Sequence, residues 1–151
     1  MVIAFPSQVV RSRIFSGNFF LLRGNVEKFV DRARRIWRLI HDDFVRAFEQ
    51  HDVLLTPVTL SAARQNSWFV KADNRQRTAV EDACTQAANL AGIAAVAVPV
   101  GLDSRGLPLS VQLMAPSGQE HRLLSVAQWL QEHAAFRCKT LEAGAQLNKE
   151  I

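Results

Sequence analysis

Apolar residues recur every three or four positions along much of the chain, which is the spacing of an amphipathic helix. The clearest stretch begins at Asn25, a residue type that often caps helices, and predicts one long helix down to Phe48. Its apolar stripe consists of Val26, Phe29, Val30, Ala33, Ile36, Trp37, Ile40, Phe44 and Phe48. A second helix is expected over 79–91, ended by Gly92. The stretch HRLLSVAQWLQEH predicts a third.

Short apolar runs between these helices predict strands. Residues 53–56 form one run, which Pro57 stops. Residues 94–100 and 109–114 form a hairpin pattern around DSRG, where Gly106 is able to adopt a positive φ. Strands that alternate with helices predict an α/β fold.

Two further segments are less regular. The stretch RSRIFSGNFFLL predicts a short helix that leads into a turn near Gly17. Residues 58–78 are polar and irregular, and a loop of that length often carries function or lines a site.

Composition adds little to this description. The chain has 151 residues, of which 48% are hydrophobic and 21% charged, as in an ordinary globular domain. The net charge of +4 is a mild excess and does not indicate nucleic-acid binding. The arginines at 32, 34, 35 and 38 are expected on a solvated helix face. Cys84 and Cys138 have no metal-binding or redox spacing and are expected to be reduced thiols.

The sequence contains no familiar reactive motif. A G-x-S-x-G nucleophile turn, a phosphate-binding loop and a dinucleotide fingerprint are all missing from it. His41, Asp42 and Asp43 are adjacent, so on a helix they point about 100° apart and cannot converge on one metal ion. No metal site is expected, and no apolar run is long enough to cross a membrane.

A family resemblance supplies what the motifs do not. The stretch NLAGIAAVAVPVG…RGLPLSVQLMAP, within residues 89–116, resembles the C-terminal strand-turn-strand of the amidase signature family. SGNFFLL and DNRQR are similar to one branch of that family, the mitochondrial-type A subunits of glutamyl-tRNA(Gln) amidotransferases. The resemblance extends over residues 8–137 in the family's order and spacing.

The resemblance implies the fold and the extent of the domain. Residues 1–137 are expected to form the C-terminal portion of an amidase domain, a mixed β-sheet flanked by helices that is incomplete, and residues 138–151 a polar tail. Members of the family hydrolyse amides with two serines and a lysine around a Gly/Ser-rich signature, and these residues contain no such signature. No catalytic residue is therefore expected here, and the chain by itself is expected to be inactive.

Two substrate-binding residues are implied by the resemblance. Arg13, in the R-x-R-I-x-x-G motif, corresponds to the residue that meets the carboxylate of glutamine. Asp82, seven residues before Asn89, corresponds to the residue that meets the ammonium group. The residues alone favour plainer roles, with Arg13 a solvated helix arginine and Asp82 an exposed helix residue.

The implied function is that of a segment of a glutamine-hydrolysing subunit, whose ammonia converts Glu-tRNA(Gln) to Gln-tRNA(Gln). The implied partners are a B subunit, which uses ATP and Mg, and a C subunit, which braces the assembly. The segment itself would need no cofactor, would meet the tRNA only through the complex and would work in the mitochondrial matrix. Two alternatives remain, namely a stand-alone amidase of the same family and a non-catalytic module that docks on the B and C subunits.

Overall fold

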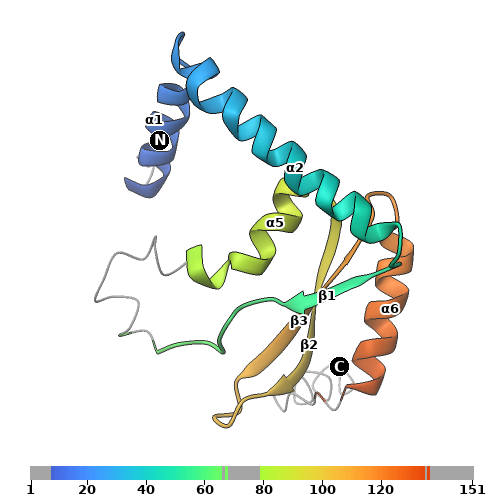
Figure 1. The fold of residues 1–151 in the computed structure, drawn as a ribbon. Coiled ribbons are helices and arrows are strands. Elements are labelled where there is room, and N and C mark those ends of the chain that lie inside the picture. Colours follow the sequence, from blue (N-terminus) through green and yellow to red (C-terminus); the bar gives the residue numbers. More distant parts are fainter. Residues whose placement is uncertain (1–7, 66, 68–78, 135, 137–151) are drawn as a thin grey trace, which may run out of the picture.

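The computed structural model describes residues 8–65, 67, 79–134 and 136. The helices are α1 (Gln8–Leu21), η1 (Val26–Val30, a π-helix), α2 (Asp31–Phe48), α5 (Ala83–Ala91) and α6 (Glu120–His133), and the strands are β1 (Leu54–Pro57), β2 (Ala94–Leu102) and β3 (Pro108–Ala115). Figure 1 shows a small sheet with α6 on one side and α5 on the other, while α2 leads away from the sheet toward α1. The α/β class expected from the sequence is confirmed.

The three described strands pair antiparallel in the order β1-β3-β2. Strands β2 and β3 form the expected hairpin, with Val96 opposite Leu113 and Val98 opposite Val111. Opposite residues share a face of the sheet, so these apolar side chains lie together on the face that α6 covers. The buried core consists of Val98, Leu113, Ala115, Leu123 and Ala127.

The second face of the sheet lies toward α5. Ala88 and Ala91 of this helix are buried, and so are Gln112 and Met114 of β3. Helix α5 ends at Gly92, which adopts the left-handed conformation with φ of 67°. The structure thus confirms the glycine stop expected at this position, where a side chain would introduce strain.

The N-terminal helix differs from the expectation. Helix α1 runs without a break through Gly17, and the chain turns instead at Gly24, where φ is 90°. One glycine costs a helix about 1 kcal/mol, which packing readily offsets. Here Phe19 and Phe20 at the end of α1 pack against Phe29 of η1, with ring centroids 6.2 and 5.6 Å apart.

The long helix begins differently from the prediction. Asn25 stands at its start but makes no side-chain capping bond, and its Nδ2 donates instead to the carbonyl of Phe19, 2.8 Å away. The first turns, Val26–Val30, form the π-helix η1 rather than part of an α-helix. Asn25 therefore joins the end of α1 to the start of the next helix.

The apolar stripe of α2 is only partly covered. Ile36 is 59% exposed and Trp37 is 45% exposed, whereas Phe44 and Phe48 nearer the sheet are half-buried. The arginines at 32, 34, 35 and 38 are exposed, as expected for a solvated face. Arg34 pairs with Asp31 at 3.0 Å. Periodicity identified the helix but could not say how much of its stripe is covered.

Two expectations about the chain's extent stand apart from this description. The boundary at residue 137 and the polar tail 138–151 lie outside the described residues. In the part of the chain that the structure describes, no helix has the length and hydropathy needed to span a membrane.

Candidate functional site

Asp82 lies at the irregular start of α5. Residues 79–81 are helical, Asp82 itself departs from helical geometry, and the regular helix begins at Ala83. Its backbone carbonyl accepts hydrogen bonds from the N–H groups of Thr85 and Gln86, at 3.1 and 3.0 Å. Its carboxylate makes no capping bond to the helix. Asp82 is thus a half-buried aspartate at the start of α5 whose carboxylate caps no backbone N–H of the helix.

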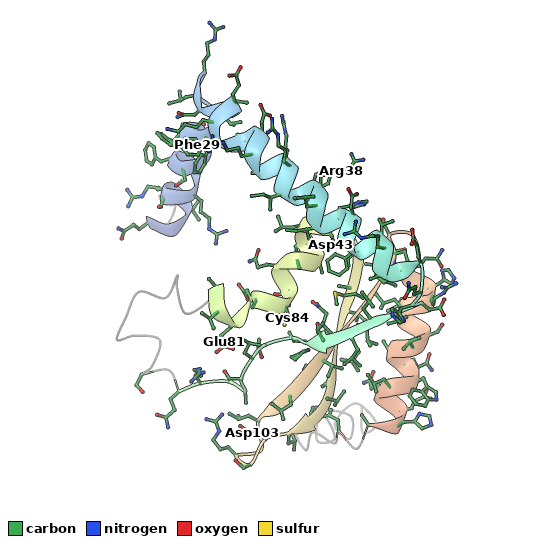
Figure 2. The ribbon with its side chains drawn as sticks, viewed as in Figure 1. Phe29, Arg38, Asp43, Glu81, Cys84 and Asp103 are labelled. Carbon is green, nitrogen blue, oxygen red and sulfur yellow. The ribbon has the colours of Figure 1, made fainter. Side chains whose placement is uncertain are left out.

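The residue before it, Glu81, is committed to a structural contact. Its Oε1 accepts hydrogen bonds from Ser61 Oγ at 2.8 Å and from Arg64 Nε at 3.2 Å. The side chain is 16% exposed, and its Oε2 is buried with no hydrogen-bond partner among the described residues. Figure 2 shows Glu81 between the start of α5 and the loop that follows β1. Glu81 thus connects two segments that are remote in sequence.

The loop after β1 is also tied to the hairpin. The N–H of Val58 donates to the carbonyl of Ser110 at 3.3 Å, and Arg105 Nη2 donates to the carbonyl of Ala63 at 3.0 Å. Asp103 holds Arg105 in place and also accepts the N–H of Leu107 at 2.9 Å, at the hairpin tip (Figure 2). The loop and Glu81 line an open surface pocket of about 350 Å³, formed by Thr59, Ser61, Ala62, Ala63, Arg64 and Glu81.

Both carboxyls of this region have lowered pKa values. The hydrogen bond from Ser61 holds the pKa of Glu81 below its usual value, helped by Arg64 and opposed by desolvation. The N–H of Leu107, followed by Arg105, lowers the pKa of Asp103, again against desolvation. Both groups therefore favour the ionised form in the folded chain.

These shifts predict a loss of stability in acid. A carboxyl whose folded pKa is below its unfolded pKa contributes stability in full above the unfolded value, and the contribution disappears as pH falls through the folded value. Urea unfolding should therefore show a lower midpoint at about pH 3 than at about pH 6. Asp103→Asn should reduce this difference, while Glu132→Gln on the exposed side of α6 serves as the control. An unchanged pH dependence in Asp103→Asn would contradict the assignment.

Gln112 is a site residue that sequence reasoning missed. It is 5% exposed, and its Nε2 lies 3.2 Å from the carbonyl of Cys84 on α5 and 3.3 Å from Thr56 Oγ1 on β1. The only signal in the sequence was the placement of Gln112 among the apolar residues at the end of β3. Gln112 fixes α5 to the sheet just after Asp82.

Arg13 is exposed on α1. No hydrogen bond or ion pair links Arg13 to Asp82 among the interactions of the described residues. In Figure 1 the helices that carry them, α1 and α5, lie on the same side of α2. The structure thus places the two residues on separate elements and leaves their joint role as a proposal.

Other polar residues fit structural roles. His41 Nδ1 lies 3.4 Å from Asp42 Oδ1, and Asp43 pairs with Arg46 one turn further along α2. No group of three histidine, cysteine, aspartate or glutamate residues within the described ranges could hold a metal ion. The thiol of Cys84 is free and half-buried.

Comparison with known proteins gives this site a context. The family model described as Amidase matches residues 4–124. The mitochondrial A subunit of glutamyl-tRNA(Gln) amidotransferase from Aedes aegypti is 51% identical over 128 residues, which are 85% of this chain and 26% of that protein. The corresponding protein of Bos taurus is 48% identical over 131 residues, 86% of this chain and 25% of that one. The chain thus spans about a quarter of the length of the curated relatives it matches.

Solved structures agree with these relatives. The A subunit of glutamyl-tRNA(Gln) amidotransferase from Thermotoga maritima superposes with a TM-score of 0.68 at 26% identity, covering 85% of this chain and 28% of that one. A 6-aminohexanoate cyclic dimer hydrolase superposes with a TM-score of 0.62 at 25% identity, covering 76% of this chain and 25% of that one.

Proposed function

Since this chain belongs to the amidase family, we propose that it serves within the glutamine-hydrolysing A subunit of a tRNA-dependent amidotransferase. The observation that carries the proposal is Asp82, a half-buried carboxylate at the start of α5 that caps no helix. Identities of 44–52% to mitochondrial A subunits support the choice of this protein over other amidases.

Glutamine presents three groups to a binding site, namely a side-chain amide, an α-ammonium and an α-carboxylate. We assign the ammonium to Asp82, because a carboxylate forms an ion pair with an ammonium group. We assign the carboxylate to Arg13, because the planar guanidinium donates two parallel hydrogen bonds to a carboxylate. The amide would then point toward catalytic groups that lie outside these residues in the family's sequence.

The proposal extends to the complex. Ammonia released from glutamine would pass to a B subunit, which converts Glu-tRNA(Gln) to Gln-tRNA(Gln), and a C subunit would brace the assembly. ATP and Mg are assigned to the B subunit on the basis of the resemblance to amidotransferase A subunits. The names of the relatives support a place in the mitochondrion, where the reaction would serve translation.

A stand-alone amidase is the second candidate. The structural likeness to 6-aminohexanoate cyclic dimer hydrolase favours it, since that protein is named as a hydrolase and not as an amidotransferase subunit. Such an enzyme has no need of Arg13 and Asp82 as a pair. A docking module without activity is the third candidate, supported by exposed apolar side chains on α1 such as Phe15, which is 73% exposed.

A chimera tests these three candidates. This segment replaces the matching 128 residues of the Aedes aegypti protein, and the product is assembled with the B and C subunits. We expect it to form Gln-tRNA(Gln) with either glutamine or ammonia as the nitrogen source. Use of ammonia but not glutamine would support a docking role, and hydrolysis of simple amides in preference to glutamine would support the stand-alone amidase.

A further inference from the structure

The start of α5 is fastened to the rest of the molecule on both sides of Asp82. One residue earlier, Glu81 Oε1 accepts hydrogen bonds from Ser61 and Arg64. Two residues later, the carbonyl of Cys84 accepts a hydrogen bond from Gln112 Nε2 at 3.2 Å. Asp82 therefore lies between two attachment points, and both restrain the position of its backbone.

Both attachments lead to the sheet. Gln112 is itself a β3 residue, with β1 and β2 on either side of it. Glu81 reaches the hairpin through the loop after β1, because Val58 and Ala63 of that loop bond to Ser110 and Arg105. Loss of either attachment would release the helix start from one side while leaving the buried core intact.

The Glu81 contact combines terms that favour and oppose stability, and it fixes the position of the carboxylate. The side chain of Arg64 is 44% exposed, and an ion pair with one solvated partner adds little to folding. Burial of Glu81 Oε2, which has no donor among the described residues, acts against stability. The 2.8 Å hydrogen bond from Ser61 nevertheless fixes the carboxylate, and with it the backbone next to Asp82.

We propose that Glu81 is a positioning residue, which holds Asp82 where it meets the α-ammonium group of the substrate. This inference rests on the proposed function. It predicts that Glu81 and its partner Ser61 affect recognition of the ammonium group specifically. The amide-cleaving step itself would be unaffected.

The test compares glutamine with glutaramate, which is glutamine without its α-amino group. The chimera described above carries Ser61→Ala, Glu81→Gln or Glu81→Ala, with Asp82→Asn as the reference and Glu132→Ala on α6 as the matched control. Glu81→Ala should lower kcat/KM for glutamine about three- to tenfold, mainly through KM, and leave glutaramate unchanged. Ser61→Ala, which removes only a hydroxyl, should show the same selectivity. Glu81→Gln keeps an acceptor oxygen and should restore most of the loss.

The two proposals fail in different ways. If Asp82→Asn lowers the preference for glutamine over glutaramate while the Glu81 and Ser61 variants do not, Glu81 has no positioning role and the proposed function stands. Equal losses on both substrates in Glu81→Ala and Ser61→Ala would show a merely structural role. If Asp82→Asn leaves the preference unchanged, both proposals are wrong.

Discussion

Replacing Asp82 by Asn is expected to lower kcat/KM for glutamine about ten- to a hundredfold in the chimeric amidotransferase. The substitution keeps the shape of the side chain and removes its charge, so a charge-assisted contact to the α-ammonium is lost. Such a contact contributes about 1.5–3 kcal/mol when it is partly buried. Arg13→Lys should have an effect of similar size, because lysine keeps the charge and loses the two parallel hydrogen bonds to the carboxylate.

The nitrogen source provides the control for this experiment. Ammonia enters after the glutamine-binding step, so both variants should amidate Glu-tRNA(Gln) normally when ammonia is supplied. Normal use of glutamine by both variants would show that the two residues do not bind it and would favour the stand-alone amidase. An equal loss with ammonia and with glutamine would show that the residues are structural.

Leu113→Ala is expected to destabilise the chain by about 2–5 kcal/mol, the usual cost of removing a buried leucine side chain. Leu113 is 2% exposed and lies in the core between the sheet and α6. Truncation leaves a cavity that the flanking strands cannot close, because both are paired to β3. The urea midpoint, followed by far-ultraviolet circular dichroism, measures the effect.

Leu55 is the matched control for Leu113. It is the residue directly opposite Leu113 on β1, so it has the same type and the same face of the sheet, but it is 59% exposed. Leu55→Ala should change stability by only about 0.5 kcal/mol. Similar losses in the two variants would contradict the location of the core between β3 and α6.

The sequence was sufficient wherever a short segment decides its own conformation. The hairpin of β2 and β3 follows from two apolar runs around a turn, in which Gly106 adopts a φ of 78°. The stop of α5 at Gly92 has the same origin, since only glycine enters the left-handed region at little cost. The last helix was likewise recognisable from its period, and the structure has it at Glu120–His133.

Local rules failed where neighbouring elements compete. Gly17 predicted a turn, yet α1 continues through it. The contacts of Phe19 and Phe20 with Phe29 stabilise the helical conformation. Asn25 was predicted to cap the helix, yet its side-chain Nδ2 donates a hydrogen bond to the carbonyl of Phe19 instead. In each case a contact with a second element outweighs the preference of the single residue.

For the candidate site, the sequence by itself determined which residues to consider. Through the family resemblance it singled out Arg13 and Asp82, whose joint role stays a prediction. Only the tertiary structure decided what surrounds Asp82, namely Glu81 with its partner 20 residues away and Gln112 with its partner 28 residues away. A glutamate at a helix start and a glutamine in a strand have no local signature of such roles. Their hydrogen bonds exist only because folding brings the loop, the helix and the sheet together.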